Sequence, residues 1–415
     1  MRDLSSAAPE QVGLTASGLA AIDTYLQGWI AKGVVAGLVT LIARHGKIVH
    51  TSTLGQKDLA TGEPMALDTM FRIFSMTKPV TAVAMMILHD RRLWSPDDPI
   101  AKHLPAFEGA QVFGGLDGAG APILLDADHP PTLRELLTHT AGLTYGREPM
   151  GGLEALYEAA DLWRSPDLSE MAARLGALPL AYQPGTKWIY SLAMDVQGAI
   201  IEKLSSQSLP DFMRDEIFAP LGMVDTAFHT PPEKRARLAT LYRSSASRGL
   251  VALPVNPLLP DHDTPPALAS GGGGLVSTVG DYARFAQMLL NHGEFGGRRI
   301  ISEHAARLMM TNQLSEEMLA HGWGIGHQQI RPGFGQGFNG VVFTDPNAAG
   351  VPVGVGTYHW DGAAGTWFWV DPANDLIFVG MVQLLSETAP ALQATTQTLM
   401  AEAISSPADH VLTTP

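Results

Sequence analysis

The chain has 415 residues, of which 46% are hydrophobic, and its formal net charge is −14 at neutral pH. Such an acidic balance argues against nucleic acid and anionic membrane surfaces as partners. The chain contains no cysteine, which excludes disulfides, thiolate metal ligands and a cysteine nucleophile. The N-terminus has no apolar core of signal-peptide length and no stretch approaches a membrane span, so we expect a cytoplasmic protein.

The N-terminal part predicts a helix followed by a β-hairpin. Apolar residues recur at helical spacing over residues 15–31, and the pattern stops at Gly33. Two apolar segments, 37–43 and 47–53, then flank the turn sequence Arg44-His45-Gly46.

Helical patterns dominate from about residue 93 to residue 269, and joints rich in proline and glycine separate them. The predicted helices cover residues 132–140, 153–163, 167–176, 191–205 and 209–217, and a Gly-rich stretch at 109–121 predicts a loop or small hairpin. After the glycines 271–274 we predict helices at 279–292 and 302–311, strands at 351–360, 366–370 and 376–383, and a last helix at 389–404.

Strands therefore occur at both ends of the chain, with a helical block between them. We predict an α+β fold in which one antiparallel sheet, flanked by helices, is built by residues 1–93 plus 270–415. Residues 94–269 would form an inserted, mainly helical domain, with the active site between the two domains.

Ser75-Met76-Thr77-Lys78 is the only S-x-x-K sequence in the chain, and it lies where an apolar strand gives way to a helix. Pro79 fits only the first turn of a helix, which places the helix start close to Ser75. Residues three apart share one helix face, so the Lys78 amine can reach the Ser75 hydroxyl and, if desolvated, take its proton. The alternative is a helix-capping serine followed by a solvated lysine.

Two further segments could complete such a site. Tyr190 belongs to the only Tyr-Ser pair in the chain, and a tyrosine near a lysine ammonium can act as general acid or base. The segment 358–365 reads as a late strand rich in small residues, whose backbone N–H groups could bind an oxyanion. The alternatives are an aromatic packing residue and a Gly-rich sheet edge with buried tryptophans.

The sequence lacks the motifs of two other classes of hydrolase, the α/β-hydrolases and the metallohydrolases. No serine lies in a G-x-S-x-G sequence, which disfavours an α/β-hydrolase. No H-E-x-x-H or comparable spacing indicates a metal site, and we predict neither a metal nor another cofactor. We expect His139 to be structural rather than a member of a catalytic triad.

Taken together, these motifs resemble the serine β-lactamase and penicillin-binding-protein superfamily. Within it they are similar to the class C-like esterases (family VIII carboxylesterases), to which the fungal lovastatin acyltransferase is related. The resemblance covers nearly the whole chain. It rests on segments in the family's order: Phe71–Lys78, Leu136–Leu143, Tyr190–Leu192, Gly273–Thr278 with Asp281, and Trp360–Gly362.

This resemblance implies Ser75 as the nucleophile and Lys78 and Tyr190 as the pair that activates it. Either member of the pair could be the base, since coupled groups titrate as a unit. The family geometry would form the oxyanion hole from the backbone N–H groups of Ser75 and Ala363.

The resemblance also implies a substrate pocket with two departures from the lactamases. Trp360-Asp361-Gly362, with His359 beside it, stands where lactamases carry Lys-Thr-Gly, so an apolar wall replaces a lysine that holds the substrate carboxylate. Leu192 stands where they carry an asparagine that binds the substrate amide. Asp361 would repel carboxylated substrates, and it also departs from the Trp-Gly-Gly-like motif of the esterases.

We therefore predict a serine carboxylesterase that hydrolyses small-molecule esters with short or medium acyl chains through an acyl-enzyme on Ser75, with acyltransferase side activity. Trp367 and Trp369 favour apolar substrate parts, with core packing as the alternative for both. The other enzymatic interpretation is a β-lactamase or D-amino-acid peptidase. From a different class, the alternative is a non-catalytic penicillin-binding-like protein. The sequence leaves the oligomeric state open.

Overall fold

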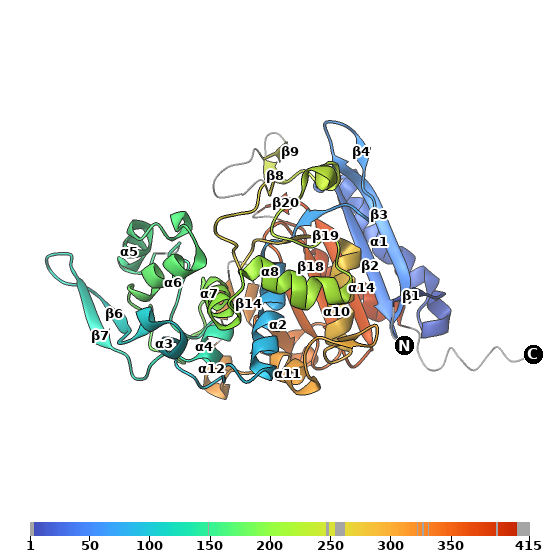
Figure 1. Cartoon of the computed structure of the whole chain (residues 1–415). Coiled ribbons are helices and arrows are strands. Elements are labelled where there is room, and N and C mark those ends of the chain that lie inside the picture. Colours follow the sequence, from blue (N-terminus) through green and yellow to red (C-terminus); the bar gives the residue numbers. More distant parts are fainter. Residues whose placement is uncertain are drawn as a thin grey trace, which may run out of the picture.

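The computed structural model describes residues 4–147, 149–245, 249–253, 262–321, 323–325, 328–330, 332–386 and 389–404. Its centre is a nine-stranded sheet in the order β1-β3-β2-β19-β18-β17-β16-β15, with β4 beside β3 (Figure 1). Only β1 and β3 pair in parallel in this sheet; its other neighbours are antiparallel. The strands are β1 (Ser5–Ser6), β2 (Gly37–Arg44), β3 (Lys47–Asp58), β4 (Glu63–Pro64), β15 (Phe334–Gly337), β16 (Gly340–Phe343), β17 (Tyr358–Asp361), β18 (Trp367–Asp371) and β19 (Leu376–Val382).

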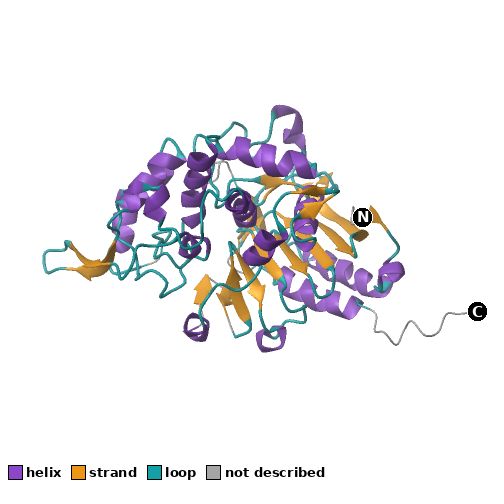
Figure 2. Ribbon diagram, turned by 60° about the horizontal axis from the view of Figure 1, so that its bottom comes forward, coloured by secondary structure: helices purple, strands orange, loops and turns teal. Residues whose placement is uncertain are grey.

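Helices cover both faces of this sheet, because its strands alternate apolar side chains to either side (Figure 2). On one face, α1 (Ala16–Ala31) and α14 (Leu392–Ala403) pack on a cluster that includes Trp367 and Trp369. On the other face, α2 (Thr77–Asp90) and α10 (Val279–Leu290) pack on a cluster that includes Trp360. Core packing, the alternative for Trp367 and Trp369, is therefore what the structure shows.

The described chain from α3 to α9 is mainly helical, apart from a hairpin of β6 (Gln111–Leu116) and β7 (Pro122–Asp126) that projects from the body in Figure 1. The α2 face of the sheet and this region share one continuous apolar cluster. The division into two domains stays a prediction. The helices here are α3 (Ile100–His103), α4 (Leu133–Leu137), α5 (Leu153–Ala159), α6 (Leu168–Gly176), α7 (Ala193–Ser205), α8 (Leu209–Met213) and α9 (Ala219–Leu221).

Short elements connect these parts. Two-stranded pairs are formed by β5 (Phe71–Arg72) with β10 (Val276–Ser277), β11 (Glu294–Phe295) with β12 (Arg298–Arg299), and β13 (Trp323–Ile325) with β14 (Gln328–Ile330). A three-stranded sheet joins β8 (Tyr242–Ser245), β9 (Gly249–Ala252) and β20 (Leu384–Leu385). The remaining helices are α11 (Glu303–Met309), α12 (Glu316–His321) and α13 (Pro346–Ala349). Within the described ranges, no helix is both long and apolar enough to cross a membrane.

The predicted α+β class and the antiparallel sheet built from both ends of the chain are confirmed. The helix predicted at 132–140 ends earlier, at Leu137, because His139 adopts a left-handed backbone with φ 61°. The strand predicted at 351–360 was wrong over its first part, since β17 begins only at Tyr358. β15 and β16, which are short and contain glycine, were not predicted.

Candidate active site

Ser75 lies on a sharp turn between β5 and α2. Phe74, directly before it, has a left-handed backbone with φ 43°, which a bulky residue seldom adopts. The short helix η2 (Phe74–Met76) then leads into α2, with Pro79 in its first turn as predicted. The turn presents Ser75 at the N-terminal end of α2, where the helix dipole favours negative charge.

Lys78 is fully buried beneath this turn. Its Nζ donates hydrogen bonds to Ser75 Oγ at 3.2 Å, to the Gly272 carbonyl at 2.7 Å and to Tyr145 OH at 3.2 Å. Burial disfavours the ammonium and lowers the pKa of Lys78 to about 7. The alternative of a solvated lysine is therefore wrong, and a large share of the amine is neutral at physiological pH.

The contacts of Lys78 also orient its lone pair. The Gly272 carbonyl can only accept a hydrogen bond, and the Tyr145 hydroxyl can accept a second one. A neutral amine has two N–H bonds, so when both are used in this way its lone pair is left for Ser75 Oγ. This is the geometry that a general base toward Ser75 needs.

Tyr190 contacts the same hydroxyl from the other side, with its OH 2.6 Å from Ser75 Oγ. Lys78 Nζ lies 4.6 Å from the centroid of the Tyr190 ring. Burial raises the pKa of Tyr190 above its ordinary range, so the phenol keeps its proton. The arrangement suits Tyr190 as a proton donor better than as a base.

His139 supports Tyr190 rather than joining Ser75. Its ring lies 5.0 Å from the Tyr190 ring, and its Nδ1 is 3.0 Å from Ser191 Oγ. Its carbonyl accepts from the Ile189 amide at 2.8 Å, which fixes the segment that carries Tyr190. Burial holds the pKa of His139 well below its ordinary value, so the imidazole stays neutral.

The end of β17 approaches the Ser75 turn closely at Gly362. A Cβ on Gly362 would lie 2.4 Å from the Ile73 carbonyl oxygen, which shows how little space separates the two segments. Thr366 Oγ1 donates to the same carbonyl at 3.3 Å. Among the described residues, and outside the bonds within helices and strands, the amides of Ser75 and Ala363 donate to no backbone carbonyl. The oxyanion hole formed by these two amides stays a prediction.

Three other predicted pocket residues, Trp360, Asp361 and Leu192, differ in burial and chemistry. Trp360 is buried, and its ring lies 6.0 Å from that of Tyr190. Asp361 is half-buried; burial raises the pKa of its carboxyl to about 7, although the charge of Lys78 acts in the opposite direction. Leu192 is buried in the apolar core and offers no polar group.

The structure does not bring His359 to this cluster. Its Nδ1 is 2.8 Å from Gln393 Nε2 of α14, and its ring stacks on Phe343 at 4.9 Å. Neighbouring residues of a strand point to opposite faces, so His359 turns away from the side on which Trp360 meets Tyr190. The predicted contact between His359 and substrate is therefore corrected: this histidine packs between the sheet and α14.

Sequence reasoning missed three residues around Lys78. Tyr145 and Gly272 bind its amine directly, and Asp195 binds the Gly272 amide at 3.3 Å. Tyr145 follows the segment Leu136–Leu143 by two residues, and Gly272 belongs to the run of four glycines. Neither position carries a pattern that would have identified its partner.

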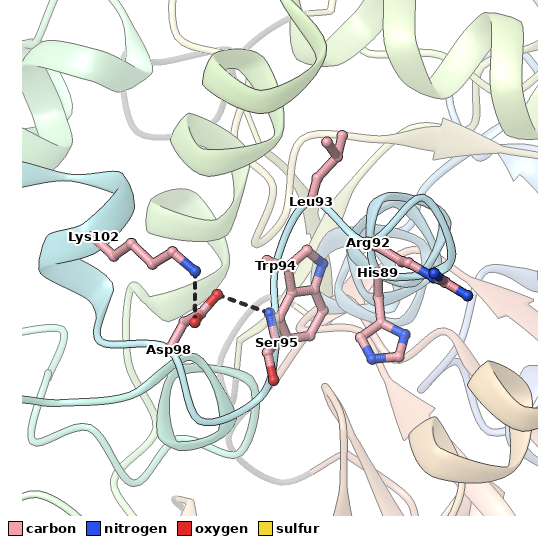
Figure 3. A pocket seen from close by; sticks show the side chains of 7 residues that line it. All are labelled: His89, Arg92, Leu93, Trp94, Ser95, Asp98 and Lys102. Carbon is pink, nitrogen blue, oxygen red and sulfur yellow. Dashed lines mark hydrogen bonds and ion pairs between the residues drawn. The ribbon is translucent and has the colours of Figure 1, made fainter.

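A separate cavity of about 320 Å³ lies at the opposite end of α2 (Figure 3). Its carboxylate, Asp98, accepts from Lys102 Nζ at 2.8 Å and from the Ser95 amide at 2.9 Å. The dashed lines in Figure 3 join Asp98 to Lys102 and to the Ser95 amide, so the carboxylate is already paired with an ammonium and an amide. The chemistry is therefore concentrated at the start of α2, not here.

Comparisons with known proteins agree with this geometry. Residues 21–402 match the Beta-lactamase family. Protein Rv1367c of Mycobacterium tuberculosis is 37% identical over 358 residues, which cover 85% of this chain and 86% of that protein. Esterase EstB of Burkholderia gladioli is 32% identical over 406 residues, which cover 92% and 93%.

Solved structures show the same fold. EstCE1, described as a hydrolase with promiscuous acyltransferase activity, superposes with a TM-score of 0.76 at 27% identity and covers 94% of this chain and 99% of its own. Simvastatin synthase (LovD) of Aspergillus terreus superposes with a TM-score of 0.78 at 23% identity, covering 94% and 98%. The superfamily expected from the motifs is confirmed, and the chain belongs to the beta-lactamase family.

Proposed function

We propose that this protein is a carboxylic ester hydrolase that forms an acyl-enzyme on Ser75. One observation carries the proposal: Ser75 Oγ lies 3.2 Å from the buried amine of Lys78 and 2.6 Å from Tyr190 OH. The 32% identity with Esterase EstB and the likeness to EstCE1 support ester substrates and acyl transfer to a second alcohol as a side activity.

The proposed reaction begins with Lys78 as the base. Its neutral amine takes the proton of Ser75 while Oγ attacks the ester carbonyl carbon, and the carbonyl electron pair moves to the oxygen. The amides of Ser75 and Ala363 hold this oxyanion. When the intermediate collapses, Tyr190 donates its proton to the leaving alcohol and regains one from Lys78. Water or another alcohol, activated by the same pair, then attacks the acyl-enzyme and restores Ser75.

The function is tested by assaying p-nitrophenyl butyrate and the cephalosporin nitrocefin side by side, with wild type and Ser75→Ala. We expect Ser75-dependent turnover of the ester and little or none of nitrocefin. Faster Ser75-dependent hydrolysis of nitrocefin would make the protein a lactamase. No Ser75-dependent turnover of either substrate would favour a non-catalytic binding protein.

The lactamase alternative rests on the family match alone. Carboxylated substrates such as the common β-lactams would meet Asp361, half-buried at the end of β17, and the apolar wall of Trp360. Leu192 has no group that could bind a substrate amide. These three residues favour uncharged esters.

Replacing Asp361→Asn should relax this selectivity against acids. At pH 8 the Asp361 carboxyl is mostly charged, because its pKa is about 7. We expect the ratio of kcat/KM for the p-nitrophenyl monoester of glutaric acid to that for p-nitrophenyl butyrate to rise about tenfold in the variant, since a like charge is removed. Because both substrates depend on the same base, the ratio cancels any change that the substitution causes in the reactivity of Lys78. In the wild type the same ratio should rise as pH falls from 8 to 6, and a ratio unaffected by either change would contradict the assignment.

A further inference from the structure

Asp195 is a buried acidic residue near Lys78, and the proposed reaction does not use it. It lies in the first turn of α7 and is 2% exposed. Its Oδ1 accepts from Ser270 Oγ at 2.6 Å and from the Gly272 amide at 3.3 Å. Its Oδ2 is buried and, within the described part of the chain, has no hydrogen-bond partner. Burying a carboxylate with one bare oxygen is costly, and burial raises the pKa of Asp195, while the Ser270 hydrogen bond and the charge of Lys78 act in the opposite direction.

Gly272 connects this carboxylate to the amine of Lys78. The Gly272 N–H donates to Asp195, and its carbonyl accepts from Lys78 at 2.7 Å. A Cβ on Gly272 would lie 3.1 Å from Asp195 Oδ2 and 3.5 Å from both Lys78 Nζ and Tyr145 OH. The carboxylate, the amine and the phenol therefore surround one glycine, with no side chain between them.

We propose that Asp195 is a positioning residue for Lys78: it holds the 270–272 turn whose carbonyl orients the amine, and its charge stabilises the ammonium that forms when Lys78 takes the Ser75 proton. The inference rests on the proposed ester hydrolysis with Lys78 as the base. Asp195 makes no hydrogen bond to Ser75 or Tyr190, so its contacts reach the reacting atoms through Gly272 and Lys78. Its charge also adds to the burial that raises the pKa of Tyr190 and of Tyr145, which keeps both phenols protonated.

Several charged groups face Lys78, and the effect of each on the pKa of its amine has to be distinguished. Asp195 on α7 and Asp361 at the end of β17 favour the ammonium, whereas Arg147 disfavours it. Tyr145 and Tyr190 stay protonated because burial raises the pKa of both. Of the two carboxylates, Asp195 is also bonded to the turn that binds Lys78, so its loss affects both charge and position.

Asp195→Asn separates charge from shape. The amide oxygen can still accept from Ser270 and Gly272, while the negative charge is gone. Because an opposite charge is removed, the pKa of Lys78 should fall, and the acid limb of kcat/KM for p-nitrophenyl butyrate should move to lower pH by about one unit. The plateau kcat should fall about tenfold, since the ammonium loses its partner, while KM stays within about twofold.

The matched control is Asp281→Asn in α10. Asp281 is also a buried carboxylate, but it accepts from the Asp225 amide at 2.7 Å and from Thr226 Oγ1 at 3.0 Å. This variant should leave the acid limb where it is. The proposal would be overturned if the pH profile of kcat/KM and the kcat of Asp195→Asn matched those of the wild type. The proposed Ser75-dependent esterase activity would not be affected by that result.

A second variant decides the matter if Asp195→Asn does not fold. Ser270→Ala keeps the carboxylate and removes one of the two donors that hold it. We expect kcat to fall about threefold at unchanged KM, because the turn that orients Lys78 is loosened. An unchanged kcat in this variant would overturn the proposal. A wild type without Ser75-dependent turnover would instead remove the proposed function itself.

Discussion

Ser75→Ala should lower kcat for p-nitrophenyl butyrate by at least about a thousandfold, the largest effect we expect from a single change. Without Oγ there is no nucleophile for the acyl-enzyme, and Lys78 and Tyr190 have no proton to exchange with it. The residual rate would come from binding and the oxyanion amides alone. Stability should change little, because the change removes one partly buried hydroxyl. Mass spectrometry of the wild type with a slowly hydrolysed ester should show acyl transfer to Ser75, and none in the variant.

Ser52→Ala is the matched control for this result. Ser52 lies beside both a histidine and an aspartate: its Oγ is bonded to Asp23 and lies 3.0 Å from His50 Nε2. The same His50 nitrogen also faces Asp23 at 3.0 Å, so the ring cannot hold the acid on one nitrogen and the serine on the other. We expect full activity in this variant. Loss of turnover in Ser52→Ala with retention in Ser75→Ala would contradict the assignment of the nucleophile.

The parts of the site that could be predicted are those set by short-range rules. Ser75 and Lys78 are three residues apart, and the position of Pro79 places the helix start beside them, so their contact follows from helix geometry. The alternation of strand residues also separates His359 from Trp360, although both were assigned to one pocket. That error came from grouping residues by sequence proximity instead of by face.

The remaining parts depend on contacts between distant segments. Lys78 and Gly272 are 194 residues apart, and Asp195 and Gly272 are 77 apart. No periodicity links such positions, because the fold alone brings the start of α7 to the glycine turn. The left-handed backbone of Phe74, which exposes Ser75, likewise has no local signal. The contact between Ser75 and Lys78 could therefore be predicted from the sequence, whereas the groups that surround the Lys78 amine could not.

Lys78→Met should lower kcat by about a thousandfold or more and at the same time stabilise the fold. Lys78 is fully buried, and the pKa of its amine falls from 10.5 to about 7 on folding. The unfolded chain therefore binds more protons between these values, and the penalty is nearly complete at pH 7, where it amounts to about 4 kcal/mol. Methionine has a similar shape and no charge, so it relieves this penalty. The lost hydrogen bonds to Gly272 and Tyr145, and the lost charge beside Asp195, offset part of the gain. We expect a net gain of about 2 kcal/mol in the free energy of unfolding at pH 7.

The pH dependence of this gain tests its origin. As pH rises from 7 towards 10.5 the unfolded lysine loses its proton too, so the advantage of Lys78→Met over the wild type should shrink steadily. Lys203→Met, a change at an exposed lysine of α7, should leave both activity and stability near wild type. Urea unfolding at pH 7, 8 and 9 measures all three proteins. If Lys78→Met were less stable than the wild type at every pH, the amine would be held as a paired ammonium in the folded protein. Lys78 could then not be the free base, and Tyr190 would have to take the Ser75 proton despite a pKa that burial raises.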